Sequence, residues 1–596
     1  YVSGNSYLFE AIGSIIGGII TSFILIRYFP SFEILVMVSI LNLLFLTFLS
    51  RNRYYGVMFV LFLILYVSGI FSKLDKFSIS YEWKPFNLVE SKNSIYGNIS
   101  VIDLSGEYNF YENGSKIFST AEKQYSEEIV HFSMFSFSFE PKNVLLVGGT
   151  LSGNLFEVLK YPVERVVCVE LDPTLVQIGK KYVSKDITSL FEDPRVEIIH
   201  TDPRFYIKNT REKFDCVILD TPDPVSIFIN RFYTKEFFEE IKKILTPSGI
   251  ITTSLSSSEN YMSEELKILS SSIYKSIKSV YKECKIIPGI KNYFVASDET
   301  LPISFADTFI EKISHKKIDL TYLTPHYLRY LLREDRIEKV KNWIIEKEQL
   351  TFINKDFAPV SYFYGLRYWL SYFGKNYSEV LYLLQKTNFF YTILAIFILF
   401  LILFFIIRKN QQLYYFPVLI LVGVNGFCGI VLELLLIFSF QIVHGYIYYQ
   451  IGILLTAFMA AIATGSFISS RYIKKNLSRF VILVEFIFLV YSFLLIFLIG
   501  RRLPAFLWII LVFFSGLPVG LVFPLANQII SSKKENKTYG KVIGSVYSFD
   551  LWGATLGAFL SSSFLVPVFG IIKTCNIVSF LLGIIIILLT LSRKFL

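Results

Sequence analysis

The chain has 596 residues, a net charge of +10, 53% hydrophobic residues and a mean hydropathy of +0.52. These values exclude an ordinary soluble protein and favour a membrane protein with several domains. Loop lysines and arginines facing lipid headgroups explain the positive charge better than a nucleic-acid footprint does. We therefore expect a lipid bilayer and no nucleic acid as a partner.

The cysteines bear on metal sites and disulfides, and the first residue bears on the N-terminus. The cysteines show neither metal-ligand nor disulfide spacing, so we expect no metal site. Three of the five, Cys168, Cys216 and Cys284, fall in or beside predicted strands, as small core residues do, and the other two are Cys428 and Cys575. Because the chain starts at Tyr1 rather than Met, we expect a processed or truncated N-terminus.

Apolar runs of about 20 residues, long enough to cross a bilayer, occur in two blocks. The interval 77–387 has no such run, which predicts a multi-pass protein of the cell membrane with an inserted soluble domain. We expect membrane helices in 1–76, the soluble domain in 77–345, a helical connector in 346–387 and membrane helices in 388–596. The runs are 7–28, 32–50, 55–72, 388–407, 414–441, 448–470, 480–499, 504–531, 543–567 and 571–591.

One pattern occurs in both blocks. Segments 4–17 and 544–557 both read G-x-x-Y-x-x-(acid)-x-x-G-x-x-x-G, with Glu10 and Asp550 as the acids. The match predicts a membrane region of two related halves, of which the first is incomplete. Small residues four apart favour close helix packing. The acids, like Glu433 and Glu485 elsewhere, alternatively face a partner or a cavity.

The soluble interval begins with short strands from about residue 88, with a hairpin turn at Asn113-Gly114. An apolar strand then runs into the glycine turn Val144 to Gly153, and a helix-like run covers 154–160. A second strand, 166–169, ends in Glu170, twenty-two residues after Gly148. This is the layout of a nucleoside-binding βαβ unit, in which the acid takes the ribose hydroxyls.

Further acids follow the later strands. Asp202 follows a strand at 196–200, and Asp220 and Asp223 follow a strand at 216–219. Ligands bind at the carboxyl ends of strands in a doubly wound sheet, so we expect these acids and Glu170 to share one crevice. A helix at 234–245 and strands at 249–254 and 293–297 complete the predicted α/β unit.

These motifs resemble the spermidine synthase (polyamine aminopropyltransferase) family over roughly 88–300, and its membrane-fused branch in particular. The glycine turn, with Gly148, Gly149 and Gly153, resembles the family's G-G-G-D-G-G. Its ribose acid matches Glu170, its adenine acid matches Asp202, and its D-S-S-D-P signature matches 220–224. Its Tyr-(His/Gln)-Glu element matches Tyr125-Ser126-Glu127, with His131 four residues further on. The segments 230–234 and 354–359 resemble the membrane-fused branch.

The resemblance implies a Rossmann-like, S-adenosylmethionine-dependent-methyltransferase-like sheet with a small N-terminal β portion. It implies transfer of an aminopropyl group from decarboxylated S-adenosylmethionine, as co-substrate and without a further cofactor, to putrescine or a related amine. Asp220 would take a proton from the amine. Asp223 and Tyr125 would position the amines, and Glu127 would bind substrate. The family's members are commonly dimers or tetramers, which makes a homo-oligomer an expectation.

Departures from the family lie in the amine half. Leu151 stands where the family has an aspartate, Ile117 where a glutamine is common, and Val225-Ser226-Ile227 where it has G-P-A. These departures leave two alternatives open. One is a transporter or sensor that binds polyamine or nucleoside through a catalytically degenerate domain. The other is a methyltransferase, against which the D-T-P-D-P element argues.

Overall fold

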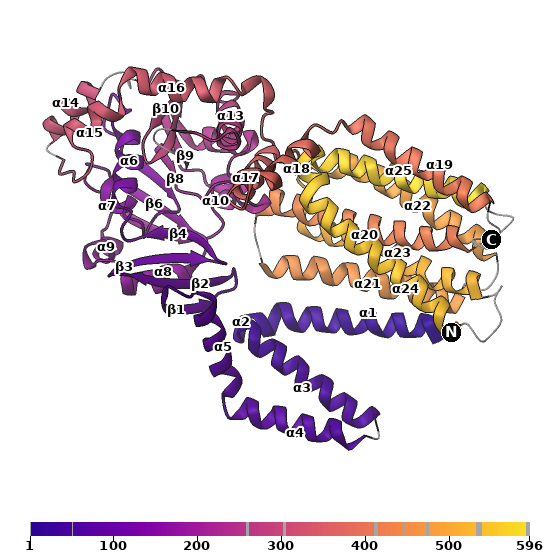
Figure 1. Cartoon of the computed structure of the whole chain (residues 1–596). Helices are drawn as coiled ribbons and strands as arrows, with labels where there is room; N and C mark the ends of the chain where they lie inside the picture. The colour runs from indigo at the N-terminus through magenta and orange to yellow at the C-terminus, as the bar shows by residue number, and fades with distance from the viewer. Residues whose placement is uncertain are drawn as a thin grey trace.

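The computed structural model describes residues 2–50, 52–257, 261–301, 306–316, 318–409, 415–445, 448–472, 476–531 and 539–591. Tyr1, and with it the expectation about the N-terminus, lies outside these ranges. The described chain forms an α/β unit and, beside it, a bundle of long apolar helices that extends away from it (Figure 1).

The N-terminal helices pass along and then away from the bundle (Figure 1). Helix α1 (Val2–Ile20) continues through a π-helical turn, η1 (Thr21–Leu25), into α2 (Ile26–Tyr28) and is followed by α3 (Ser31–Leu49). Helices α4 (Arg53–Val67) and α5 (Ile70–Glu82) are bent by 69°. This bend lies within the apolar run at 55–72, because Gly69 takes the left-handed φ of +72° that ends α4.

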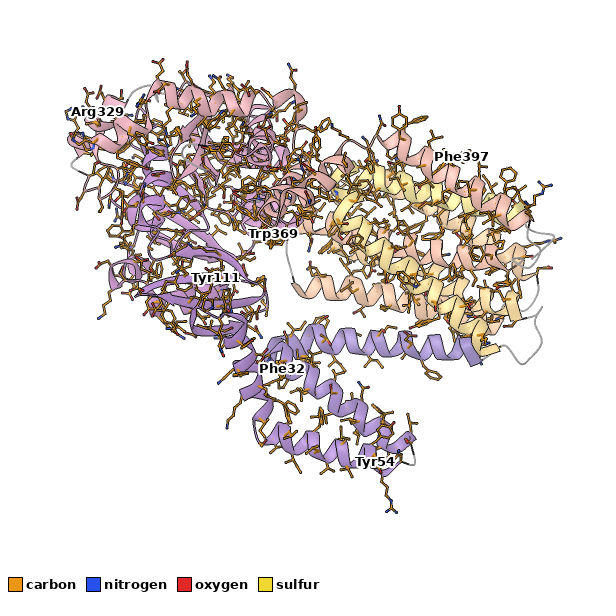
Figure 2. All side chains as sticks on the ribbon, viewed as in Figure 1. Phe32, Tyr54, Tyr111, Arg329, Trp369 and Phe397 are labelled. Carbon is orange, nitrogen blue, oxygen red and sulfur yellow. The ribbon has the colours of Figure 1, made fainter. Side chains whose placement is uncertain are left out.

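The second block of helices forms the bundle. Within the described residues, seven helices of the chain are long and apolar enough to cross a membrane, or eight if α4 and α5 are one span. Figure 2 shows the side chain of Phe397 on α19 of the bundle and that of Phe32 on α3, outside it. The bundle comprises α19 (Phe389–Lys409), α20 (Phe416–His444), α21 (Tyr448–Tyr472), α22 (Leu477–Leu498), α23 (Ala505–Ser531), α24 (Tyr539–Leu560), η6 (Ser561–Phe569) and α25 (Gly570–Leu591).

The two copies of the repeated pattern differ in their packing. On α24, a Cβ added at Gly557 would lie 2.8 Å from the carbonyl oxygen of Phe427 on α20, so the missing side chain permits that approach. On α1, a Cβ added at Gly13 or Gly17 would meet no atom of the described residues within 4 Å. The acid of the first copy, Glu10, accepts a 3.1 Å hydrogen bond from the Tyr547 hydroxyl on α24.

The α/β unit begins with a four-stranded antiparallel sheet in the order β1-β2-β3-β4. Its strands are β1 (Asn87–Asn93), β2 (Asn98–Leu104), β3 (Glu107–Glu112) and β4 (Ser115–Ser119). Asn113 and Gly114 join β3 to β4 with φ values of +51° and +78°, the backbone of a two-residue hairpin turn. The predicted hairpin is thus confirmed.

A seven-stranded sheet follows, in the order β10-β11-β9-β8-β5-β6-β7. Strands β5 to β9 are parallel, while β10 and β11 form an antiparallel hairpin at the edge. This confirms the expected methyltransferase-like sheet, although β10 was not expected. The strands are β5 (Asn143–Val147), β6 (Arg165–Glu170), β7 (Val196–His200), β8 (Phe214–Leu219), β9 (Leu245–Ser256), β10 (Glu283–Pro288) and β11 (Lys291–Ser297).

Successive residues of the central strands point to opposite faces and build two cores. Leu145 and Val147 of β5 belong to the core under α12 and α13, while Val144 and Leu146 belong to the core under α6 and α7. The helices of the unit are α6 (Lys123–Met134), α7 (Asn154–Val158), α8 (Pro173–Tyr182), α9 (Lys185–Ser189), α10 (Pro203–Asn209), α11 (Ile227–Asn230), α12 (Lys235–Ile244), α13 (Glu264–Lys278), α14 (Ala306–Lys316), α15 (Pro325–Leu331) and α16 (Glu334–Ile345).

Helices α17 (Val360–Ser371) and α18 (Lys375–Gln385) connect the α/β unit to the bundle, where Figure 2 places Trp369. The two parts also touch directly. Nζ of Lys208 on α10 donates 2.8 Å and 3.3 Å hydrogen bonds to the carbonyl oxygens of Ile442 and Val443, at the end of α20. The Ile571 N–H of α25 donates to the carbonyl oxygen of Phe357 at 2.9 Å. The end of α20 therefore packs on the α/β unit.

Candidate functional site

The glycine turn after β5 closes around the start of the segment that follows β8. Gly148, Gly149 and Gly153 have φ values of +72°, +73° and +109°. A Cβ added at Gly148 would lie 2.5 Å from the carbonyl oxygen of Asp220, and one at Gly149 would lie 2.5 Å from its Oδ2. Glycine is therefore required here both by the backbone conformation and by the approach of Asp220.

Asp220 is held by donors from three elements. The Tyr125 hydroxyl donates to Oδ1 at 2.8 Å. On the other side, Nδ2 of Asn154 donates to Oδ2 at 2.8 Å and Oγ of Ser152 donates to it at 3.2 Å. Asp220 lies at the carboxyl ends of the neighbouring strands β5 and β8, where the strand order of the sheet reverses. Ligands bind at this point in such sheets.

Tyr125 is buried on α6 and its hydroxyl also lies 3.0 Å from Oγ of Ser254 on β9. Burial, followed by the charge of Asp220, raises the pKa of Tyr125 well above its usual value. The phenol therefore keeps its proton and acts as a donor to Asp220.

Three acids, Glu112, Glu170 and Asp172, lie around the end of β6, and we call them the acidic group. Glu170 is buried, and its Oε1 accepts a 3.0 Å hydrogen bond from the Thr150 N–H of the glycine turn. Burial is the main cause that raises the pKa of Glu170, and Asp220 and Asp172 add to it. Glu112, from the N-terminal sheet, lies close enough to Glu170 and Asp172 that burial and their charges raise its pKa to about 7.

Asp202 caps α10, accepting a 3.0 Å hydrogen bond from the Phe205 N–H through Oδ1. Its Oδ2 pairs with the guanidinium of Arg231, which lies over the rings of Phe228 and Phe232, at 4.4 Å and 4.6 Å from their centroids. A Cβ added at Gly445, which follows α20, would lie 3.2 Å from Cγ of Asp202. The acid matched to the adenine site is thus paired with an arginine and packed against the helical bundle.

The remaining predicted residues are less central. Oδ1 of Asp223 accepts a 3.1 Å hydrogen bond from the Ser256 N–H, which places Asp223 beside the end of β9. Glu127 is not brought into the acidic group. Its carboxylate accepts hydrogen bonds of 2.8, 2.8 and 3.0 Å from the N–H groups of residues 321, 322 and 323, and it fixes that loop.

The departures from the family have structural counterparts. Leu151 is buried in the apolar cluster that joins the N-terminal sheet to α8, so it serves packing. The Lys291 ammonium lies over the Tyr125 ring, 4.1 Å from its centroid. A resident cation thus stands beside the tyrosine matched to amine binding, whereas the group around Glu170 holds acids.

Several residues of this site were missed by sequence reasoning. Asn154 and Ser152 flank a predicted glycine, so their place beside the turn was a usable signal. Glu112 and Lys291 come from the four-stranded sheet and the edge hairpin, and no local pattern marks them. Arg231 lies in the segment 230–234, whose resemblance to the membrane-fused branch implies no role for this residue.

The chain is similar in sequence to known proteins. The family model of the spermine/spermidine synthase domain matches residues 122–300. The polyamine aminopropyltransferase of Saccharolobus solfataricus is 39% identical over 164 residues, covering 27% of this chain and 53% of the relative. That of Sulfurisphaera tokodaii is 34% identical over 209 residues, covering 34% of this chain and 67% of the relative.

A crystal structure of a spermidine synthase in complex with the transition-state analogue AdoDATO aligns over 44% of this chain and 88% of its own, with 24% identity and a TM-score of 0.37. The chain spans about half to two thirds of the length of the curated relatives it matches. With its methyltransferase-like sheet and the 122–300 match, the chain belongs to the spermine/spermidine synthase family, whose curated relatives are named polyamine aminopropyltransferase.

Proposed function

We propose that the chain is a membrane-bound aminopropyltransferase. It transfers an aminopropyl group from decarboxylated S-adenosylmethionine to putrescine or a related amine and releases methylthioadenosine. The observation that carries the proposal is the hydrogen bonding of Asp220 to Tyr125 and Asn154. It occurs at the carboxyl ends of β5 and β8, next to the buried Glu170.

The nucleoside half of the proposed site is formed by the glycine turn and Glu170. A carboxylate has about four lone-pair positions, so Glu170 can accept from ribose hydroxyls while it accepts from the Thr150 N–H. The turn glycines let the ligand approach the backbone closely. Asp202, which follows β7 and matches the family's adenine acid, is paired with Arg231.

The proposed reaction is an in-line displacement. The neutral nitrogen of the acceptor amine attacks the propyl carbon attached to the sulfonium; the C–N bond forms, the C–S bond breaks, and methylthioadenosine leaves with the electron pair. Asp220 supplies this neutral nitrogen by accepting a proton from the ammonium form of the amine before the attack, and the product nitrogen is left as a secondary ammonium. Tyr125, Asn154 and Ser152 fix the orientation of Asp220 for this step.

Charge also supports the proposal. Both the donor nucleoside and the acceptor amine are cations, and they must meet in one site. The acids at the strand ends lower the repulsion between them. Glu112 adds a negative charge when a cation is bound, because a neighbouring positive charge favours the ionised form.

We further propose that the helical bundle places the enzyme in a cell membrane, with the borders 1–76, 77–345, 346–387 and 388–596 for its parts. The length and apolar composition of the helices support this. We also propose that the enzyme forms a homo-oligomer, on the strength of the family alone.

The test is the release of methylthioadenosine by the purified full-length chain in lipid nanodiscs, given decarboxylated S-adenosylmethionine and a series of amines. Release with at least one amine, lost in Asp220→Asn, supports the proposal. The control variant is Asp307→Asn, since Asp307 is exposed on α14 with a side-chain exposure of 75%. No release with any amine would contradict it.

A second candidate is a sensor or transporter that binds polyamine or nucleoside without turnover. The position of Lys291 over Tyr125 favours it, because a fixed ammonium there competes with the acceptor amine. In that case the nanodisc sample would retain radiolabelled spermidine or methylthioadenosine in equilibrium dialysis yet release no product.

A further inference from the structure

Two polar side chains meet inside the helical bundle. Asn425 of α20 and Glu485 of α22 are 2% and 0% exposed. Nδ2 of Asn425 donates a 2.5 Å hydrogen bond to Oε1 of Glu485. This is a buried side-chain pair that the proposed transferase chemistry does not use.

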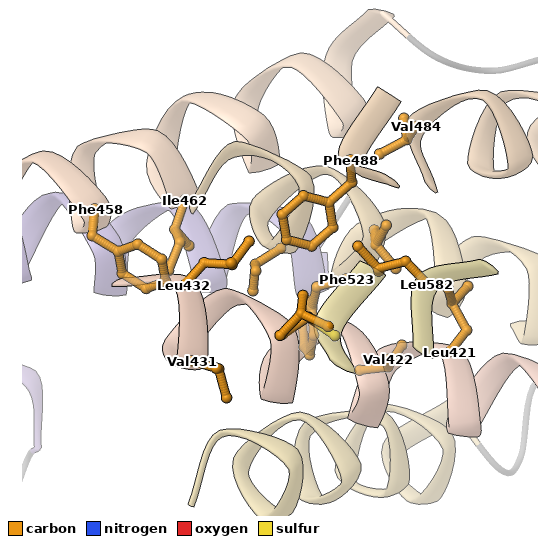
Figure 3. Packing of buried hydrophobic residues seen from close by; sticks show 14 of the residues in the cluster. Leu421, Val422, Val431, Leu432, Phe458, Ile462, Val484, Phe488, Phe523 and Leu582 are labelled. Atoms are coloured by element: carbon orange, nitrogen blue, oxygen red, sulfur yellow. The ribbon is translucent and has the colours of Figure 1, made fainter. Parts of the chain in front are cut away.

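The surroundings of the pair are apolar. Val422 of α20 and Val484 and Phe488 of α22 belong to the large core of the bundle, with Leu582 of α25. Figure 3 shows these side chains gathered in one cluster. In the described part of the chain, Asn425 is the hydrogen-bond partner of Glu485, and Glu485 makes no ion pair there.

The titratable groups on the packed helices are few. On α20 itself, Cys428 lies one turn from Asn425, and on α24 the carboxylate of Asp550 lies beside Gly426, where an added Cβ would be 2.8 Å from its Oδ1. Helix α25 carries Cys575, which is buried, and Lys573, whose ammonium lies over the Phe389 ring of α19. Helix α23 has no titratable side chain. Helix α20 also carries Glu433 and His444, and α22 carries Arg479, exposed near its start, and Tyr491, whose hydroxyl donates to the carbonyl oxygen of Leu511. No described cation forms an ion pair with Glu485.

The hydrogen bonding of the pair has two gaps. Two buried acceptor atoms of the pair receive no hydrogen bond from the residues that the structure describes: Oε2 of Glu485 and Oδ1 of Asn425. One N–H···O bond already joins the amide group to the carboxyl group through Oε1. The two atoms without a donor are the other oxygen of the carboxyl group and the oxygen of the amide group. A protonated carboxyl and a primary amide can form a ring with two hydrogen bonds, one in each direction. One proton on Oε2 fills both gaps and removes the buried charge.

We propose that Glu485 and Asn425 form a proton-binding site between α20 and α22, in which protonated Oε2 of Glu485 donates to Oδ1 of Asn425. Loading takes one proton from water, forms one O–H bond and changes the charge of the bundle by one. The structure thus gives the helical half a site for proton uptake that is separate from the acids of the α/β unit.

The test is infrared spectroscopy of the full-length chain in lipid nanodiscs at pH 7. The spectrum of the wild type minus that of Glu485→Gln should show the C=O stretch of a protonated carboxylic acid, sensitive to deuterium exchange. The amide introduced by this substitution can form two N–H···O bonds with Asn425, so the variant preserves the contact. In the Asn425→Ala background the same difference band should shift to higher wavenumber, because the ring is lost. A carboxylate band pair in place of the acid band would overturn the proposal.

A second measurement needs no variant. Dicyclohexylcarbodiimide reacts with protonated carboxyl groups in apolar surroundings, and mass spectrometry of the digested wild type locates the label. Glu485 should be labelled at pH 7, and less so as the pH is raised. Labelling of Glu485 that does not fall as the pH is raised would contradict the proposal. Neither measurement depends on aminopropyl transfer, so this proposal and the proposed function fail independently.

Discussion

The hydroxyl of Tyr125 on α6 donates a 2.8 Å hydrogen bond to Oδ1 of Asp220, which follows β8. This bond ties a helix packed across the sheet to the acid at the point where the strand order reverses. Because the phenol is buried and keeps its proton, the bond has one direction and fixes one oxygen of Asp220. The other oxygen is oriented by Asn154.

Replacing Tyr125 with Phe removes this donor without changing the packed ring. Hydrogen bonds to charged groups contribute about 1.5–3 kcal/mol, so we expect kcat/KM to fall about 10- to 100-fold. The loss should lie in the amine-dependent step, with the KM for the nucleoside unchanged. Steady-state release of methylthioadenosine measures it. Tyr261→Phe, at a residue 67% exposed, is the control and should be neutral. An equal rise in both KM values would contradict this role.

Replacing Arg231 with Met leaves the buried Asp202 without its cation. Breaking a buried ion pair by removing one partner costs about 3–5 kcal/mol, so we expect the free energy of unfolding to fall by that amount. The double variant with Asp202→Asn should recover part of the loss. Denaturation of the full chain followed by tryptophan fluorescence measures both. Arg329→Met, in an exposed pair with Asp307, should cost less than about 1 kcal/mol. Equal costs at the two arginines would contradict the assignment.

Glu112 predicts a pH dependence of stability. Burial first, then Asp172 and Glu170, raises its pKa from 4.5 to about 7, so the folded chain holds its proton more tightly than the unfolded chain. Its contribution to stability is therefore greatest below pH 4.5, falls between pH 4.5 and 7, and stays low above pH 7.

Glu112→Gln removes this dependence. At pH 8 the variant should be more stable than the wild type by about 1–3 kcal/mol, and below pH 4.5 the two should agree. Thermal unfolding across this pH range provides the comparison. Glu107→Gln on the same strand is exposed and serves as the control. A Gln variant that tracks the wild type at every pH would show that Glu112 is solvated.

Lys291 predicts an effect on the acceptor amine. Its ammonium lies 4.1 Å from the Tyr125 ring centroid, where it repels a second cation. Lys291→Met should lower the KM for putrescine several-fold and leave the KM for decarboxylated S-adenosylmethionine unchanged. Lys282→Met, at an exposed position before β10, is the control. A raised KM for the amine would instead mean that Lys291 helps to bind it.

Much of the nucleoside half could be predicted, because its signals are local. The glycines take positive φ values and Glu170 ends β6, so the alternation of apolar runs with turns was enough to place them on one sheet edge. The same alternation places Asp220, which directly follows β8, at this edge. The hairpin at Asn113-Gly114 follows from the same kind of short-range rule.

The rest depends on contacts between distant segments. Glu112 reaches Glu170 from another sheet, and Lys291 reaches Tyr125 from the edge hairpin. Glu127, predicted to bind substrate with Tyr125, instead fixes the loop at 321–323, because residues two apart in a helix point in different directions. The break between α4 and α5 depends on the single residue Gly69 within an apolar run.

Asp220 has the central role in the proposed reaction, because it accepts the proton of the attacking amine. The most direct test of this role is single-turnover release of methylthioadenosine by the wild type and by Asp220→Asn in nanodiscs, with saturating decarboxylated S-adenosylmethionine and the best amine found. General-base catalysis contributes about 10²–10⁴-fold, so the variant should be slower by that factor, and less so as the pH is raised and more of the amine is neutral. A variant as fast as the wild type at pH 7 would contradict this role.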